Sequence, residues 1–190
     1  IELDLIDKQA RRIHLIVSKL LNFSKPDQIS NFAAPVLLKD IVDSALILVT
    51  ADLHKIAIER HDVDAPAVEI IESELQQVLI NLFINAGQAM PNGGTLFVET
   101  GPHNQNGKNG VMISVRDTGS GIPAEIIQNI FDPFFTTKQA EGTGLGLSIS
   151  HELIARAQGS LTVTSSEGEG TTFFVWCPLR HSVQSATDFS

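Results

Sequence analysis

Apolar side chains recur every three or four residues through the first 25 positions of the chain. This spacing is typical of a helix that packs against a partner helix, and the width of the stripe favours a bundle. Residues 26–35, which begin at Pro26, are rich in turn-forming residues and are predicted to be a linker. The stripe consists of Leu3, Ile6, Ala10, Ile13, Val17 and Leu20, widened by Leu15, Ile16, Leu21 and Phe23.

From residue 36 to residue 180 the apolar period alternates between that of helices and that of strands, which predicts one globular domain. Ser73 is the expected cap of its longest helix, with Gln76 three residues on as in a capping box. The tail 181–190 is predicted to be frayed. The predicted helices are 38–52, 73–90 and 145–157; the predicted strands are 56–59, 68–70, 95–100, 111–116, 161–165 and 171–177; the loop 101–110 is predicted to join two strands as a hairpin, and 117–146 to be irregular.

Composition narrows the classes of protein. The chain has 190 residues, 43% of them hydrophobic, so it is long enough to bury a core. Its formal charge of -9 argues against nucleic acid or an anionic membrane as the main partner. An anionic ligand would therefore need a metal ion or backbone donors. A single cysteine, Cys177, fits a reducing cytosol, and no stretch has the roughly 20 apolar residues of a membrane span.

The long helix carries amides on the side opposite its apolar face. Helical spacing aligns them in one direction, and the apolar neighbours Ile80, Phe83 and Ile84 suggest that they face a cleft. Mg²⁺ binds such oxygens while it bridges phosphates, so Asn85 is a candidate metal ligand. The alternative is the wet side of an ordinary amphipathic helix. The apolar face is Leu75, Val78, Leu79, Leu82, Ala86 and Ala89; the polar stripe is Glu74, Gln77, Asn81, Asn85 and Gln88.

Asp117 follows a strand in which Val111, Ile113 and Val115 alternate, so period two places its carboxylate on the same inward face. A buried carboxylate needs hydrogen-bond donors, and the exocyclic amine of adenine is one. Gly119 and Gly121 would let the backbone turn sharply and a flat ring approach. The alternative is a common Asp/Gly turn after a strand.

Residues 142–147, with the sequence GTGLGL, lead directly into a predicted helix. Backbone N–H groups at a helix start carry partial positive charge, and glycines let phosphate oxygens approach them. The spacing does not match a P-loop, and the segment lacks the preceding strand that a dinucleotide-binding fingerprint requires. The alternative is that the glycines mark only a flexible hinge; phosphate binding is favoured over it, because a hinge and a phosphate cradle are compatible.

Three aromatic rings and one cation lie just upstream, at Phe131, Phe134, Phe135 and Lys138. The rings could anchor a lid over the ligand, and Lys138 could reach a phosphate when the lid closes. The alternative is that the rings belong to the core and Lys138 is solvated.

Four segments of the chain resemble, in the same order, the four nucleotide-binding boxes of sensor histidine kinases. They are NLFINA from Asn81, DTGSGIP from Asp117, FDPFFTTK from Phe131 and GTGLGLSI from Gly142. The resemblance covers about residues 36–179. It implies an α+β fold, a two-layer sandwich of a mixed, mostly antiparallel sheet on helices, shared with gyrase, Hsp90 and MutL ATPases. The first helix is similar to the second helix of the family's dimerisation bundle.

The resemblance also implies roles for individual residues. Asn85 would hold Mg²⁺, Asn81 would line the phosphates, and Asp117 would bind the adenine amine. The ATP lid would run from about residue 132 to residue 144, and Thr171 would support the adenine through water. The implied nucleotide-binding set is Asn81, Asn85, Gln88, Asp117, Gly119, Gly121, Ile122, Phe134, Thr137, Lys138, Gly142, Thr143, Gly144, Leu145, Gly146, Leu147 and Thr171, with Asn85 as the metal ligand.

The sequence departs from the family pattern at two places. None of the histidines matches the phosphoacceptor, because His14 lacks its setting and His151 with Glu152 follows the glycine segment. We therefore expect the chain to be a fragment that begins after the acceptor. Gln88 stands where many relatives have lysine, a feature of nitrogen-regulation type kinases.

The resemblance implies a protein-histidine kinase that uses Mg-ATP to phosphorylate a histidine outside these residues, for relay to an aspartate of a response regulator. Expected partners are a second copy, through the N-terminal helix, and a receiver domain; neither nucleic acid nor direct membrane contact is expected. The expected location is the cytoplasm, and membrane anchoring of the parent protein is left open. The alternatives are a gyrase- or MutL-like ATP-hydrolysing clamp, disfavoured by Asn81 where those enzymes have glutamate, and a non-catalytic nucleotide-binding dimerisation module.

Overall fold

The computed structural model describes residues 37–64, 68, 70–137 and 143–179. The predicted first helix, the linker, Lys138, Gly142 and the C-terminal tail lie outside the described residues and stay predictions. The described elements are α2 Leu38–Leu48, β1 Ile56–Asp62, α3 Glu72–Ala89, β2 Gly94–Gln105, β3 Lys108–Asp117, α4 Gly146–Arg156, β4 Ser160–Ser166 and β5 Gly170–Pro178.

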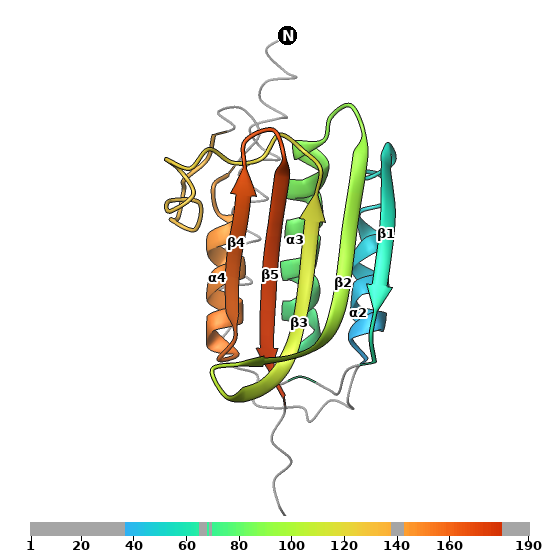
Figure 1. Cartoon of the computed structure of the whole chain (residues 1–190), viewed down its shortest axis with the longest axis vertical. Helices are drawn as coiled ribbons and strands as arrows, with labels where there is room; N and C mark the ends of the chain where they lie inside the picture. The colour runs from blue at the N-terminus through green and yellow to red at the C-terminus, as the bar shows by residue number, and fades with distance from the viewer. Residues whose placement is uncertain (1–36, 65–67, 69, 138–142, 180–190) are drawn as a thin grey trace, which may run out of the picture.

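The strands form one five-stranded sheet in the order β1-β2-β3-β5-β4, and the three helices cover one of its faces (Figure 1). β1 pairs with β2 in parallel, and the other neighbouring strands are antiparallel. The predicted two-layer α+β fold with a mixed, mostly antiparallel sheet is confirmed for the described residues. It brings the end of β3, the start of β5, the middle of α3 and the start of α4 to one side of the molecule.

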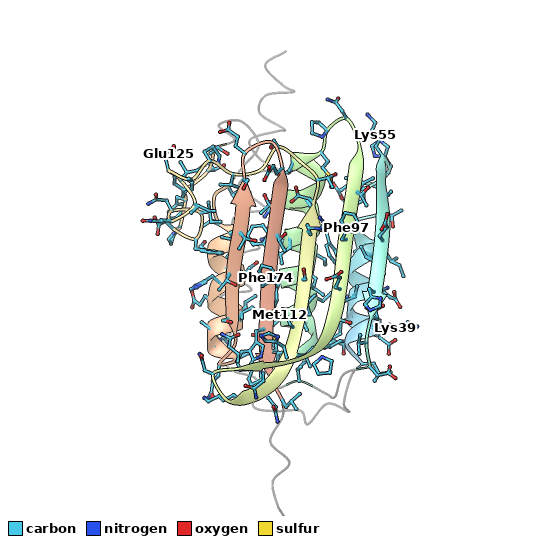
Figure 2. All side chains as sticks on the ribbon, in the orientation of Figure 1. Lys39, Lys55, Phe97, Met112, Glu125 and Phe174 are labelled. Atoms are coloured by element: carbon cyan, nitrogen blue, oxygen red, sulfur yellow. The ribbon has the colours of Figure 1, made fainter. Side chains whose placement is uncertain are left out.

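Alternation along the strands separates the core from the open face of the sheet. Leu96, Val98, Ile113 and Val175 are at most 1% exposed and pack toward the helices. Removing their apolar surface from water supplies the main driving force for this arrangement. On the opposite face lie Phe97, Met112 and Phe174, all labelled in Figure 2, and the Arg116 guanidinium stacks over the Phe97 ring with 3.9 Å to its centroid. Among the described residues no helix is long and apolar enough to cross a membrane.

The structure corrects several local predictions on α3. Its N-cap is Ile71, which makes no side-chain capping bond, and Ser73 lies inside the first turn. Phe83, expected beside the amide stripe, is fully buried in the core together with the leucines of α3. Ala89, expected on the apolar face, is only half-buried.

The loop predicted over residues 101–110 is mostly strand. β2 and β3 continue to a two-residue turn, Asn106 and Gly107, and both turn residues have positive φ, as a tight hairpin turn requires. Pro102 is tolerated because β1 ends at Asp62, opposite Thr100, so that β2 is an edge strand beyond that pair.

The strand predicted over residues 68–70 is only an isolated bridge in the described part of the chain. Val68 pairs with Leu179 in antiparallel orientation. The described residues of the predicted irregular segment, 118–137 and 143–145, contain neither helix nor strand, as expected.

Candidate functional site

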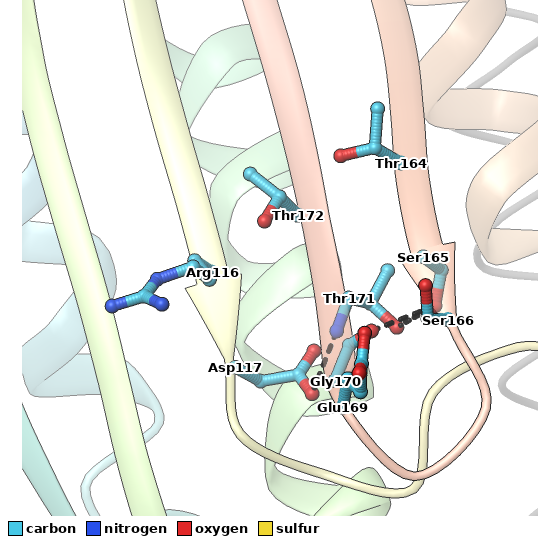
Figure 3. A pocket seen from close by; sticks show the side chains of 9 residues that line it. All are labelled: Arg116, Asp117, Thr164, Ser165, Ser166, Glu169, Gly170, Thr171 and Thr172. Carbon is cyan, nitrogen blue, oxygen red and sulfur yellow. Dashed lines mark hydrogen bonds between the residues drawn. The ribbon is translucent and has the colours of Figure 1, made fainter.

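Asp117 ends β3 on the inward face and is 4% exposed. Its Oδ1 accepts a hydrogen bond from the backbone N–H of Gly119, at 2.8 Å. It accepts a second from the backbone N–H of Thr171, at 3.3 Å, which Figure 3 shows. No described residue donates to Oδ2. Burial raises the pKa of the Asp117 carboxyl, and the two backbone N–H groups partly oppose that rise. The second oxygen can therefore accept a hydrogen bond from a ligand.

The turn after Asp117 is fixed on two sides. Ser120 N donates to the Ala89 carbonyl at the end of α3, and Gly168 N in the β4–β5 turn donates to the Ser120 carbonyl. A Cβ at Gly119 would lie 2.6 Å from the Ala89 carbonyl oxygen, and Gly121, with φ of +69°, has no room for one against Ser166. Both glycines are needed because the backbone passes between two other backbone segments.

Thr171, at the start of β5, is 4% exposed and belongs to a chain of hydroxyls. Its Oγ1 lies 3.0 Å from Ser165 Oγ, which also donates to the Gly170 carbonyl and accepts from Ile122 N, both at 2.8 Å. Because the one hydroxyl proton of Ser165 goes to Gly170, Thr171 is the donor to Ser165. The sequence analysis missed Ser165, although the pairing of β4 with β5 places it directly opposite Thr171.

A cavity of about 240 Å³ opens where β3 and β4 end and β5 begins (Figure 3). Its wall includes Asp117 and Thr171, but Arg116 and Thr172 belong to the open face of the sheet, and neither Asn81 nor Asn85 lines it. The cavity therefore marks the Asp117 end of the site and does not extend along the predicted groove to Asn85. The lining residues are Arg116, Asp117, Thr164, Ser165, Ser166, Glu169, Gly170, Thr171 and Thr172.

The amide stripe on α3 divides into different environments. Asn81 and Asn85 are half-buried, whereas Gln88 is exposed. Asn81 Nδ2 donates to Ser150 Oγ on α4 at 3.1 Å. No described residue hydrogen-bonds the Asn85 amide, so its oxygen is available to a ligand.

A backbone hydrogen bond joins two residues that precede α4. Phe134 N donates to the Gly144 carbonyl at 2.9 Å, and both residues have positive φ, at +68° and +66°. α4 begins at Gly146, without a side-chain cap, one residue later than predicted. Its first N–H groups lack intrahelical acceptors and form the positive end of the helix, as an anion site requires.

The three aromatic rings do not act together. Phe131 and Phe135 pack against the core, and the Phe131 ring centroid is 5.0 Å from that of His151. Phe134 is 71% exposed. The core interpretation therefore holds for the first two rings and is wrong for Phe134, and Thr137 is exposed as well.

These geometries place three of the sequence motifs along α3: Asp117 with its glycine turn at the end of the helix, the two asparagines in its second half, and the glycine-bounded start of α4 against Asn81. A family described as "Histidine kinase-, DNA gyrase B-, and HSP90-like ATPase" matches residues 70–181. The chain belongs to this family.

The relatives cover nearly all of the chain. The sensor histidine kinase ZraS of Escherichia coli K12 is 38% identical over 175 residues, which are 90% of this chain and 36% of ZraS. Sporulation kinase E of Bacillus subtilis is 33% identical over 95% of this chain and 24% of that protein. The chain thus spans about a third or less of the length of these relatives.

Solved structures agree with the family. The catalytic domain of histidine kinase ThkA is 30% identical, with a TM-score of 0.63, and the match covers 74% of this chain and 93% of that one. Full-length ShkA, solved in complex with AMPPNP, is 26% identical with a TM-score of 0.74, over 90% of this chain and 36% of ShkA. The histidine kinase catalytic domain and its ATPase fold, expected from the sequence, are confirmed.

The predicted binding residues of this histidine kinase domain occupy distinct places in the structure. Ile122 and Leu147 are half-buried against the core, and Leu145 is buried. Thr143 accepts a hydrogen bond at its Oγ1 from Leu145 N, at 3.4 Å. The roles assigned to these residues stay predictions.

Proposed function

We propose that this chain binds Mg-ATP and transfers the γ-phosphoryl group to a histidine that lies outside its 190 residues, for relay to a response-regulator aspartate. The observation that carries the proposal is Asp117: a buried carboxylate, oriented by two backbone donors, with its second oxygen open. An acceptor of this kind suits the exocyclic amine of adenine. The family ATPase fold, and the complex of the similar protein ShkA with AMPPNP, support nucleotide binding by this chain.

Asn81 favours transfer over hydrolysis. A carboxamide cannot take a proton from water at neutral pH, whereas a glutamate in its place could act as a general base. Phosphoryl transfer depends mainly on positioning and on stabilising charge, so a domain without a base can still present the γ-phosphate to a nucleophile. The incoming imidazole supplies its own lone pair.

Asn85 fits a Mg²⁺ ligand. Its amide is half-buried and has no hydrogen-bond partner among the described residues, and Mg²⁺ accepts neutral amide oxygens while it keeps several waters. The metal would supply charge neutralisation to the triphosphate, which matters in a chain with a formal charge of -9. The backbone N–H groups at the start of α4 would also help to neutralise the charge of the triphosphate.

The partners follow from the same proposal. The N-terminal stripe would pair with a second copy, and a receiver domain would take the phosphoryl group from the histidine. The nitrogen-regulation subgroup stays a prediction that rests on Gln88 and its neighbours in NAGQAM.

The decisive experiment is phosphorylation in trans. The chain, Mg²⁺ and γ-labelled ATP are mixed with a separate bundle fragment that carries its histidine, and acid-labile label on the fragment is expected. A fragment with that histidine changed to alanine is the control. Label-free fragment together with steady release of phosphate would favour a hydrolysing clamp, and ATP binding with neither product would favour a non-catalytic module.

A further inference from the structure

The Asn81 carboxamide lies across the first turns of α4 and is held at both ends. Its Nδ2 donates to Ser150 Oγ at 3.1 Å. Its Oδ1 lies against Gly146. A Cβ added to Gly146 would overlap this oxygen and would lie 2.9 Å from Cγ of Asn81. Gly146 and Ser150 are four residues apart and therefore share one face of α4. The amide is thus oriented by contacts from another helix.

Ser150 has no other evident task in the described structure. It is 2% exposed, and the buried neighbours on its helix, Leu153 and Ile154, are apolar. A buried hydroxyl is unfavourable unless it is hydrogen-bonded, so alanine would suit this helix position better than serine does. The bond to Asn81 accounts for the serine.

We infer that Ser150 is a positioning residue for Mg-ATP binding. By holding Nδ2 of Asn81, Ser150 turns Oδ1 toward the first residue of α4, where the glycine segment would place the phosphates. An oxygen at that point repels phosphate but accepts hydrogen bonds from metal-bound water. Ser150 therefore makes Asn81 a partner of the hydrated metal, and the inference rests on the proposed function.

Without Ser150 the carboxamide would lose this orientation. The terminal torsion of asparagine is broad, so a released amide samples many settings, and ATP binding would have to order it again. The rest of the α3–α4 contact would persist, because Glu74 and Arg156 form an ion pair at 3.5 Å and Leu75 and Ile154 stay buried. A change at residue 150 is therefore expected to alter binding without unfolding the domain.

The test is calorimetric binding of a non-hydrolysable ATP analogue to the whole chain, with Mg²⁺ and with a chelator. Ser150→Ala should weaken binding about three- to tenfold with Mg²⁺, the range of one buried hydrogen bond, and leave metal-free binding unchanged. Ser44→Ala on α2 is the matched control: its Oγ donates to the Asp40 carbonyl at 2.7 Å, away from the site, so binding should not change. In an Asn81→Ala background, Ser150→Ala should have no further effect.

The outcomes separate the two proposals. If the unaltered chain does not bind the analogue, the proposed function is wrong. If the unaltered chain binds and Ser150→Ala loses affinity equally with and without Mg²⁺, or loses the same factor in the Asn81→Ala background, the positioning role of Ser150 is overturned. Unchanged Mg²⁺-dependent binding by Ser150→Ala overturns it as well.

Discussion

The Asp117 region and the amide region of the site differ in how far the protein itself satisfies their polar groups. Around Asp117, two backbone N–H groups meet one oxygen, and Thr171 and Ser165 form a closed chain of hydroxyls. On α3, Asn81 has one hydrogen bond, to Ser150, and Asn85 has none from a described residue.

This difference fits the two parts of the proposed ligand. A flat, neutral base gains most from a preorganised pocket, because rigid partners lower the entropy lost on binding. A triphosphate brings its own metal and water, so the residues that meet it need open oxygens. The comparison predicts that substitutions near Asp117 affect both fold and base selectivity, whereas substitutions at Asn85 affect only the metal-dependent part of binding.

The largest effect is expected at Gly121, which supports the Asp117 region. Gly121→Ala should lower the free energy of unfolding by about 3 kcal/mol, because the residue has positive φ and its Cβ would overlap the Ser166 carbonyl oxygen. Gly168→Ala is the matched control, since Gly168 has φ of +80° and nothing within 4 Å of a Cβ. It should lose only about 1 kcal/mol in the same urea titration. Equal losses of unfolding free energy in the two variants would mean that contact with Ser166 does not restrict residue 121.

Asp117→Asn should weaken ATP binding about 10- to 100-fold, since hydrogen bonds to charged groups contribute about 1.5–3 kcal/mol. The asparagine oxygen can still accept from Gly119 and Thr171, which leaves its NH₂ facing the adenine amine, donor against donor. Inosine triphosphate has an acceptor at that position and should lose less affinity than ATP. Calorimetry with both nucleotides measures the ratio, and an unchanged ratio would contradict the assignment of Asp117 to the base.

Asn85→Ala should weaken Mg-ATP about tenfold, the scale of one metal-directed polar contact, and leave metal-free nucleotide almost unaffected. Gln77→Ala, on the same stripe but two turns nearer the helix start, is the control. The measurement is nucleotide titration with Mg²⁺ or a chelator present. Similar losses in both conditions would remove Asn85 from the metal site.

The smallest effect is a pH dependence from Asp117. Its native pKa is raised from the ordinary value of 3.8, mainly by burial, so between that value and the raised pKa the folded chain binds more protons than the unfolded chain. The free energy of unfolding should therefore receive a contribution that is lost as pH rises through this window. Denaturant titrations at several pH values should show that Asp117→Asn removes this slope. A slope that persists would assign it to other groups.

Much of the site could be predicted from local periodicity. Period two along β3 placed Asp117 inward, and the helical period placed Asn81 and Asn85 on one side of α3, because both follow from backbone geometry alone. The capping prediction at Ser73 was wrong. The capping-box pattern is a local signal, and it does not show that the helix already begins at Glu72. Phe83 was misplaced because the apolar face of α3 is wider than its leucine pattern indicates.

The sequence alone determined the family, the order of the motifs and the residue types that could meet a base, a metal and phosphates. Only the tertiary structure decided which of these groups are already paired. Ser150 meets Asn81 across 69 positions of sequence, and Ser165 meets Ile122 across 43. Such pairs depend on how helices and strands pack, which short-range periodicity does not encode, so the orientation of the Asn81 amide and the support of Thr171 became visible only in the folded chain.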